Sequence, residues 1–322
     1  MRLIFGIVAA SLALVGFTNF ADEAFTSHGN NTIRWMEFDI PVEGLKQALE
    51  YDIKSEGGIG WIDLLAYTVA KNWGKYPKND RNDDIDVAAT RLAQGESIED
   101  LASGLRLFPF YRRAYGAVLE GMVGEYELET DQGWERKYGV KAFFPLAAGN
   151  SFSHFDDFGN SRSYGYRRRH LGHDLMARTG VPVIAVEDGY VEALGWNRYG
   201  GWRIGIRTTD KKRYYYYAHL RKDHPFHKSL AEGVFVRAGD VIGYVGMTGY
   251  STEENVNNIS APHLHLGLQI IFDESQKDGN NQIWVDLYDI TKLLYANKMT
   301  TQKDSSTGDH IRTRNTNSVV TD

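Results

Sequence analysis

The sequence predicts an α+β protein of more than one domain, in which an α-helical domain precedes an antiparallel all-β domain. Its 322 residues are enough for about two domains. Between about residues 39 and 124, apolar residues recur every three or four positions, which is typical of helices. After about residue 133, short alternating runs are separated by glycines, which is typical of antiparallel strands. These three observations predict the fold class.

The chain divides into five expected segments. An apolar run at residues 3–17 follows Arg2, a pattern typical of an export signal. We therefore expect a protein of the cell envelope or exterior, anchored to the membrane through residues 3–17 if the signal is not cleaved. The expected segments are a signal peptide or anchor (1–21), a helical domain (25–129), a β domain (134–275), a helical extension (276–299) and a polar, disordered tail (300–322).

Individual elements follow from the same patterns. Ser97 followed by Asp100 predicts a helix start. The stretch 78–86, rich in Asn and Asp, is expected to be a solvated loop, because it lacks the Gly and closing Glu of a calcium-binding loop. Helices are expected around residues 42–49, 61–69, 111–122 and 286–296, and strands at 181–186, 189–194, 202–207, 213–219, 234–236, 241–245 and 263–270.

Composition excludes several classes of function. Thirty-six Lys and Arg against 42 Asp and Glu give a net charge of −6, so the basic excess of a dedicated nucleic-acid binder is absent. The absence of cysteine excludes disulfides, thiolate-bound metals and thiol nucleophiles. Any metal must therefore be held by imidazoles and carboxylates, and the ten histidines are the residues to consider first.

Histidines are concentrated at three places in the β domain. His170 and Asp174 lie four residues apart. His263 and His265 alternate with leucines, so a strand would place both imidazoles on one face and the leucines in the core. The same alternation would place Tyr217 and His219 on one face of their strand. Taken singly, a histidine such as His219 is more often structural, but three such elements together indicate a site.

His170, Asp174 and one of the paired histidines would form a two-histidine, one-carboxylate site. Catalytic zinc uses such a set, because an open fourth position must hold water. Zinc activates that water, and the remaining histidines can accept a proton or stabilise an oxyanion.

The β domain resembles the lysostaphin-type (LytM-like) zinc endopeptidases, which cut peptidoglycan peptides. The motifs that carry the resemblance are His-Leu-Gly-His-Asp from His170, Tyr-Tyr-Ala-His-Leu ending at Leu220, and Pro-His-Leu-His ending at His265. The resemblance implies one Zn²⁺ on His170, Asp174 and His265, with His219 and His263 as catalytic histidines. It leaves His173 as a flanking residue. It also implies a peptidoglycan peptide as the partner.

Several interpretations remain beside this one. Tyr217 is a candidate oxyanion donor, although it could merely wall the groove; Arg167, Arg168 and Arg169 could meet an acidic group of the substrate or form an exposed charge run. Residues 221–232 and 250–260 could border the groove. The rival function is a non-hydrolytic cell-wall binding or scaffolding role that retains the zinc site. In a third alternative, the helical domain occludes the groove and keeps the enzyme latent.

Overall fold

The computed structural model describes residues 33–36, 38–77, 81–164, 167–276 and 281–318. The expected signal or anchor segment lies outside these residues. Within the described part of the chain, no helix is both long and apolar enough to cross a bilayer.

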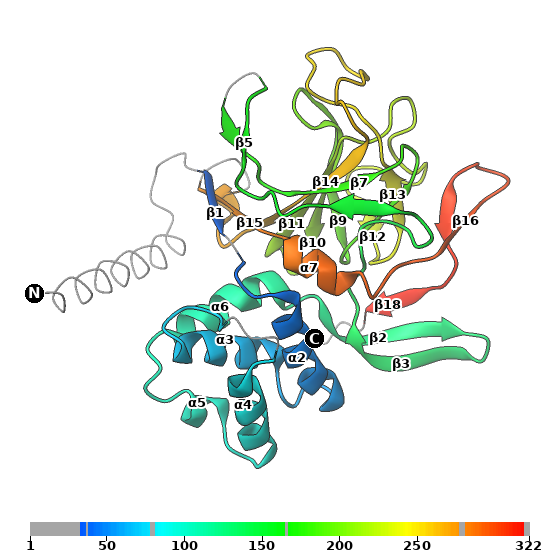
Figure 1. Cartoon of the computed structure of the whole chain (residues 1–322). Helices are drawn as coiled ribbons and strands as arrows, with labels where there is room; N and C mark the ends of the chain where they lie inside the picture. The colour runs from blue at the N-terminus through cyan, green and yellow to red at the C-terminus, as the bar shows by residue number, and fades with distance from the viewer. Residues whose placement is uncertain (1–32, 37, 78–80, 165–166, 277–280, 319–322) are drawn as a thin grey trace, which may run out of the picture.

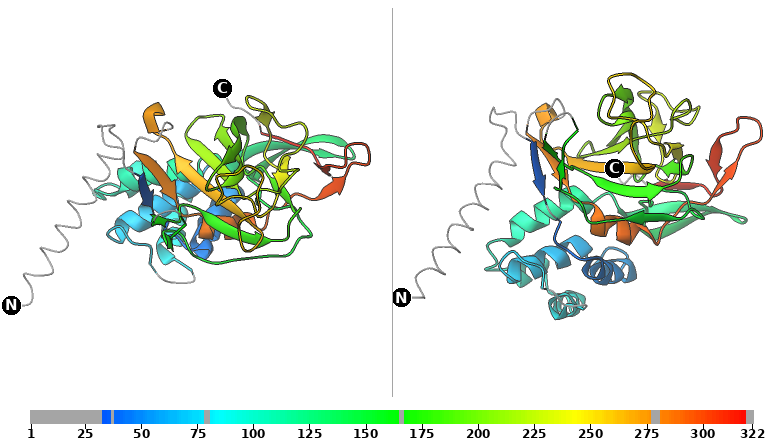
Figure 2. Two further views of the ribbon diagram at one scale, coloured as in Figure 1. Left: turned by 90° about the horizontal axis from the view of Figure 1, so that it is seen from above. Right: turned by 45° about the horizontal axis from the view of Figure 1, so that its top comes forward.

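The helical domain forms a layer on one side of the β domain (Figures 1 and 2). The expected helices are confirmed, and Ser97 caps its helix by accepting a hydrogen bond from the Asp100 amide. The helices are α2 (Val42–Lys54), α3 (Trp61–Lys71), α4 (Asp83–Ala93), α5 (Ile98–Leu101) and α6 (Phe108–Leu119).

The β domain is built on a nine-stranded sheet in which every pairing except β1 with β15 is antiparallel. Its main path is β1 (Ile33–Met36), β15 (Gln282–Val285), β14 (His263–Ile270), β11 (Arg213–Ala218), β10 (Gly201–Thr208), β9 (Gly189–Asn197) and β12 (Phe235–Val236). Off this path, β7 (His173–Ala177) pairs with both β14 and β4 (Phe152–His154). Five of the seven expected strands belong to this sheet and the other two pair with each other, so all seven are confirmed.

Smaller elements surround this sheet. The paired strands are β8 (Pro182–Ile184) with β13 (Val241–Tyr244), β5 (Ser161–Arg162) with β6 (Arg168–Arg169), β16 (Thr301–Lys303) with β17 (His310–Arg312), and β2 (Val123–Thr130) with both β3 (Gly133–Val140) and β18 (Thr316–Ser318). A 3-10 turn, η1 (Glu274–Gln276), and α7 (Tyr288–Leu294) complete the fold.

Four sequence expectations need correction. The polar tail is not disordered over residues 300–318, because β18 pairs with β2 and the fully buried Asp309 accepts hydrogen bonds from Tyr244 Oη and Lys228 N. The described end of the Asn/Asp-rich stretch begins α4, where Asp84 and Asp86 pair with neighbouring cations. The helical extension includes strand β15, and the end of the helical domain forms strand β2.

A buried ion pair joins the end of α6 to the β domain. Arg213 is 2% exposed, and its Nε donates to Glu187 Oε1 at 3.0 Å. Tyr215 Oη donates to the same oxygen at 2.6 Å. A Cβ on Gly121, just after α6, would lie 1.8 Å from Glu187 Oε2 and 2.2 Å from Arg213 Nη2. Only glycine, which has no Cβ, therefore lets the backbone at residue 121 lie this close to the Arg213–Glu187 ion pair.

Gly121→Ala is expected to lower the free energy of unfolding by about 1–3 kcal/mol, because the added methyl must displace a buried ion pair. Gly116→Ala is the matched control, since a Cβ there meets no atom within 4 Å. It removes a glycine from inside α6 and should raise stability by about 0.5–1 kcal/mol. Urea unfolding measures both values, and equal stability of the two variants would contradict the assignment of Gly121.

Candidate metal centre

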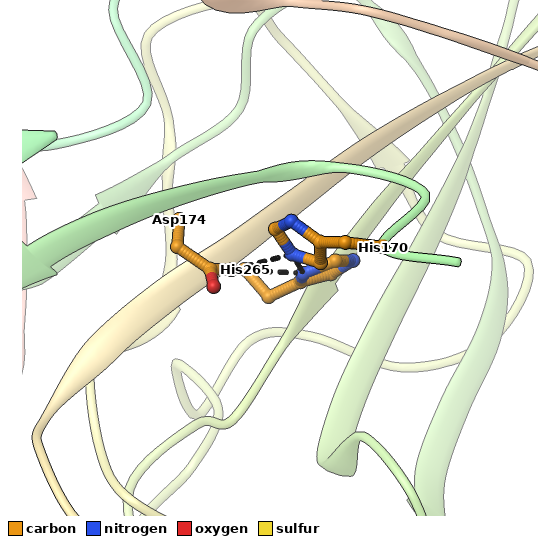
Figure 3. Close-up of side chains that lie close together, drawn as sticks. All are labelled: His170, Asp174 and His265. Carbon is orange, nitrogen blue, oxygen red and sulfur yellow. Dashed lines mark hydrogen bonds and ion pairs between the residues drawn. The ribbon is translucent and has the colours of Figure 1, made fainter. Parts of the chain in front are cut away.

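Three side chains converge at one end of the pairing between β7 and β14. In this pairing Asp174 lies opposite His265, while His170 lies in the turn that precedes β7. His170 Nε2, Asp174 Oδ1 and His265 Nδ1 lie 3.0 Å from one another (Figure 3). The structure thus brings together the three residues expected to be ligands.

This donor set fits a divalent metal ion. The ligand atoms of a tetrahedral zinc, at bonds of about 2.0–2.1 Å, lie roughly 3.3 Å apart, close to the observed separations. Burial disfavours protonation of His170, but Asp157 and Asp174 outweigh it and raise its pKa to about 9. Burial disfavours the charged form of Asp174 and so raises its pKa, but the hydrogen bonds with His170 and His265 outweigh this and hold the pKa of Asp174 well below the usual range. The cluster therefore favours positive charge at its centre.

Gly172 allows the candidate ligands to approach each other. A Cβ at this position would lie 2.5 Å from His265 Nε2 and 2.7 Å from the Leu266 carbonyl oxygen. Any side chain would push the turn that carries His170 away from β14. The glycine of the His-Leu-Gly-His-Asp motif is thus part of the site.

Asp157 and Arg162 support the ligands from behind, and sequence reasoning missed both. Asp157 Oδ1 lies 3.2 Å from His170 Nδ1. Arg162 contacts the Asp157 carboxylate and lies 3.3 Å from Asp174 Oδ2. A carboxylate behind a ligand imidazole fixes its ring orientation. These residues lie before the recognised motif and carry no spacing signal of their own.

His173 points away from this cluster, as expected of a flanking residue. It lies opposite Leu266 on β14, and its Nε2 is 2.8 Å from His154 Nδ1. Burial lowers its pKa to about 4, so the ring is neutral at neutral pH.

The two remaining histidines lie beside the ligands. The His219 ring centroid is 4.8 Å from that of His263 and 5.9 Å from that of His265. His219 Nδ1 donates to the Thr248 carbonyl at 2.9 Å, and His263 Nδ1 donates to the Ala261 carbonyl at 2.9 Å. Because a carbonyl only accepts, each Nδ1 carries the proton when the ring is neutral. Each Nε2 is then left as a proton acceptor.

His219 is held in its neutral form. Burial, together with the nearby His263 and His265, holds the pKa of His219 well below its usual value. A neutral imidazole with a free Nε2 can accept a proton at neutral pH.

The expectation for Tyr217 is wrong. His219 has φ +61, in the left-handed region, so the alternation of β11 does not continue to this residue. His219 therefore lies on the site face although Tyr217, two residues earlier, does not. Tyr217 is fully buried, and its Oη accepts a hydrogen bond from the Val186 amide at 3.0 Å. Tyr216, not Tyr217, is on the site face, with its ring 6.0 Å from that of His265.

A groove of about 980 Å³ opens over this face. The insertion at residues 250–260 borders it through Tyr250 and residues 258–260, whereas no described residue of 221–232 lines it. Helices α2 to α6 contribute no described residue to its lining, so the structure gives no support for occlusion by the helical domain.

Residues 168–286 match the model of Peptidase family M23. These residues form a family M23 domain. The family resemblance seen in the sequence is thus confirmed. The matched residues contain seven of the nine strands of the large sheet and all five histidine and aspartate candidates.

Curated relatives match part of this chain over part of their own length. The chain is 42% identical over 125 residues to the L-Ala–D-Glu endopeptidase of Bacillus subtilis strain 168, covering 39% of this chain and 37% of that protein. It is 38% identical over 98 residues to lysostaphin of Staphylococcus staphylolyticus, covering 30% of this chain and 18% of that protein. The chain thus spans less than two fifths of either relative.

A solved structure extends the likeness in fold. A LytM protein from Ruminococcus gnavus ATCC 29149 aligns with a TM-score of 0.52 and 22% identity, covering 79% of this chain and 88% of that one. At this identity the likeness concerns the fold alone.

Tyr217→Phe is expected to lower the free energy of unfolding by about 1–3 kcal/mol, because it leaves the buried Val186 amide without an acceptor. The metal content should not change. Tyr216→Phe is the control on the neighbouring residue, and should cost less because its partner, Asn197 Nδ2, is only partly buried. Thermal unfolding and metal analysis test this. A loss of kcat at unchanged stability would instead restore Tyr217 to the reaction.

Proposed function

We propose that this protein is an exported, zinc-dependent endopeptidase that hydrolyses peptide bonds of peptidoglycan. The observation that carries the proposal is the convergence of His170, Asp174 and His265 beside two histidines whose Nδ1 atoms are bound to backbone carbonyls, which leaves each Nε2 for the reaction. The M23 match supports a peptidase, and the export signal expected at residues 1–21 supports action in the cell envelope or outside the cell.

His170, Asp174 and His265 would hold one zinc ion per M23 domain. When bound, zinc polarises a peptide carbonyl and lowers the pKa of a water molecule towards neutrality. Asp157 and Arg162 keep the ligands in place from behind.

His219 and His263 manage protons in this mechanism. His219 Nε2 accepts the proton of the attacking water, since burial keeps the ring neutral and Thr248 fixes its orientation. His263, oriented by Ala261, lies one ring away, and in its imidazolium form its Nε2–H would stabilise the oxyanion. The proton that His219 has accepted would then pass to the leaving amine. The Thr248 carbonyl thus selects the His219 tautomer that can accept a proton, and the Ala261 carbonyl fixes the orientation of the His263 ring.

His265→Ala is expected to lose zinc and hydrolysis together, because it removes a ligand. His219→Ala should retain stoichiometric zinc and lose about 10²- to 10⁴-fold in rate, since it removes only the proton acceptor. His227→Ala is the control, because His227 does not line the groove. Metal analysis and the turbidity of purified peptidoglycan measure both properties. Full zinc content in His265→Ala would refute the ligand assignment.

The rival is a binding or scaffolding protein that uses the same zinc site. Zinc-loaded protein should clear a peptidoglycan suspension, a chelator should stop it, and zinc should restore it. Mass spectrometry of the released muropeptides identifies the bond that is cut. If the zinc-loaded protein sediments with peptidoglycan and releases nothing, the scaffolding role replaces the enzymatic one.

A further inference from the structure

One wall of the groove is strongly cationic. Arg162, Arg167, Arg168 and Arg169 all line it, from the β5–β6 hairpin. Two carboxylates line the same groove, Asp174 and Glu192. Asp174 is engaged by the ligand histidines and by Arg162. Glu192 lies 3.7 Å from Arg207. The groove therefore has an excess of positive charge on the hairpin side.

Arg168 differs from Arg162 in how it is held. Its Nη1 donates to the Tyr164 carbonyl at 2.8 Å. Its guanidinium carbon lies 4.9 Å from the ring centroid of Tyr199 and 5.1 Å from that of Tyr250. Aromatic rings fix a guanidinium in place without neutralising its charge. Among the residues that the structure describes, no carboxylate forms an ion pair with Arg168.

Tyr250 connects Arg168 to the proposed catalytic histidine, His219. The Tyr250 ring contacts the His219 ring edge-on, at a centroid distance of 5.8 Å. One ring therefore separates the guanidinium from the proton acceptor. An extended peptide advances about 3.3 Å per residue, so the path from the Arg168 guanidinium across the Tyr250 ring to the His219 ring spans roughly two or three residues of substrate. A charge at Arg168 is within reach of a group close to the scissile bond.

We propose that Arg168 recognises a carboxylate of the peptide substrate and makes the protein selective for acidic peptides. The inference rests on the proposed function. Planar guanidinium groups pair with carboxylates through two parallel hydrogen bonds, which favours arginine over lysine for this task. In a stem peptide that contains L-Ala–D-Glu, the carboxylate can come from the glutamate or from the C-terminus.

Four synthetic stem peptides distinguish these sources. They carry the glutamate carboxylate free or amidated, combined with the C-terminal carboxylate free or amidated. For the zinc-loaded full chain, amidation at one position should lower kcat/KM by about 10- to 100-fold, the strength of a hydrogen bond to a charged group. Amidation at the other position should leave kcat/KM nearly unchanged. Equal rates on all four peptides would overturn the inference.

Arg168→Gln should hydrolyse the acidic peptide only as fast as its amidated counterpart, at unchanged zinc content. Arg168→Lys keeps the charge and should retain part of the discrimination. Arg198→Gln is the matched control: Arg198 also lies over Tyr199, at 5.0 Å, but does not line the groove, so its selectivity should match the wild type.

The remaining outcomes separate the two proposals. If Arg168→Gln discriminates like the wild type, or loses activity equally on acidic and amidated peptides, Arg168 does not determine specificity. If the zinc-loaded wild type hydrolyses none of the four peptides and no purified peptidoglycan, the proposed function fails and the inference fails with it. Hydrolysis without discrimination refutes the inference alone.

Discussion

The antiparallel register between β7 and β14 is the constraint on which the site depends. It places Asp174 opposite His265 while Leu264 and Leu266, which alternate with the histidines, are buried in the core. A slip of one residue would exchange the imidazoles with the leucines, burying polar rings and exposing apolar side chains. The packing of the core therefore also fixes the geometry of the proposed ligands, and Gly172 lets the third of them, His170, come close enough to join the other two.

A second constraint attaches the helical layer to the sheet. Arg213, at the start of β11, is buried with Glu187 where α6 ends, so the helical layer is attached away from the groove. Arg213 Nη1 also donates to the Ala117 carbonyl of α6, so the loss of either partner of the pair would leave a buried charge next to the helical layer. Within the described part of the chain, no helix contributes a residue to the groove on the other face of the sheet.

Sequence periodicity predicted most of this fold, and its failures have physical causes. The alternation on β14 predicted the placement of His263 and His265, because half-buried histidines and buried leucines alternate over residues 263–266. The same argument failed for Tyr217, since the left-handed backbone of His219 shifts the alternation by one residue. Asp157 and Arg162 come next to the proposed ligands only in the folded chain, and no local sequence pattern identifies them. The polar tail is ordered by strand pairing and by buried Asp309, neither of which requires apolar residues.

Chemistry and selectivity occupy different elements of this groove. The proposed ligands and proton acceptors lie on or next to β7, β11 and β14, where the register of the core leaves little freedom. Arg168 lies on β6, and Tyr250 lies in the insertion that follows Gly249. Tyr250 stacks on Tyr164 at 4.6 Å and also contacts His219, so it joins the two elements at the site. Changes in the hairpin or the insertion can therefore alter which peptide is read without disturbing the metal ligands, since neither element belongs to the strands that position them.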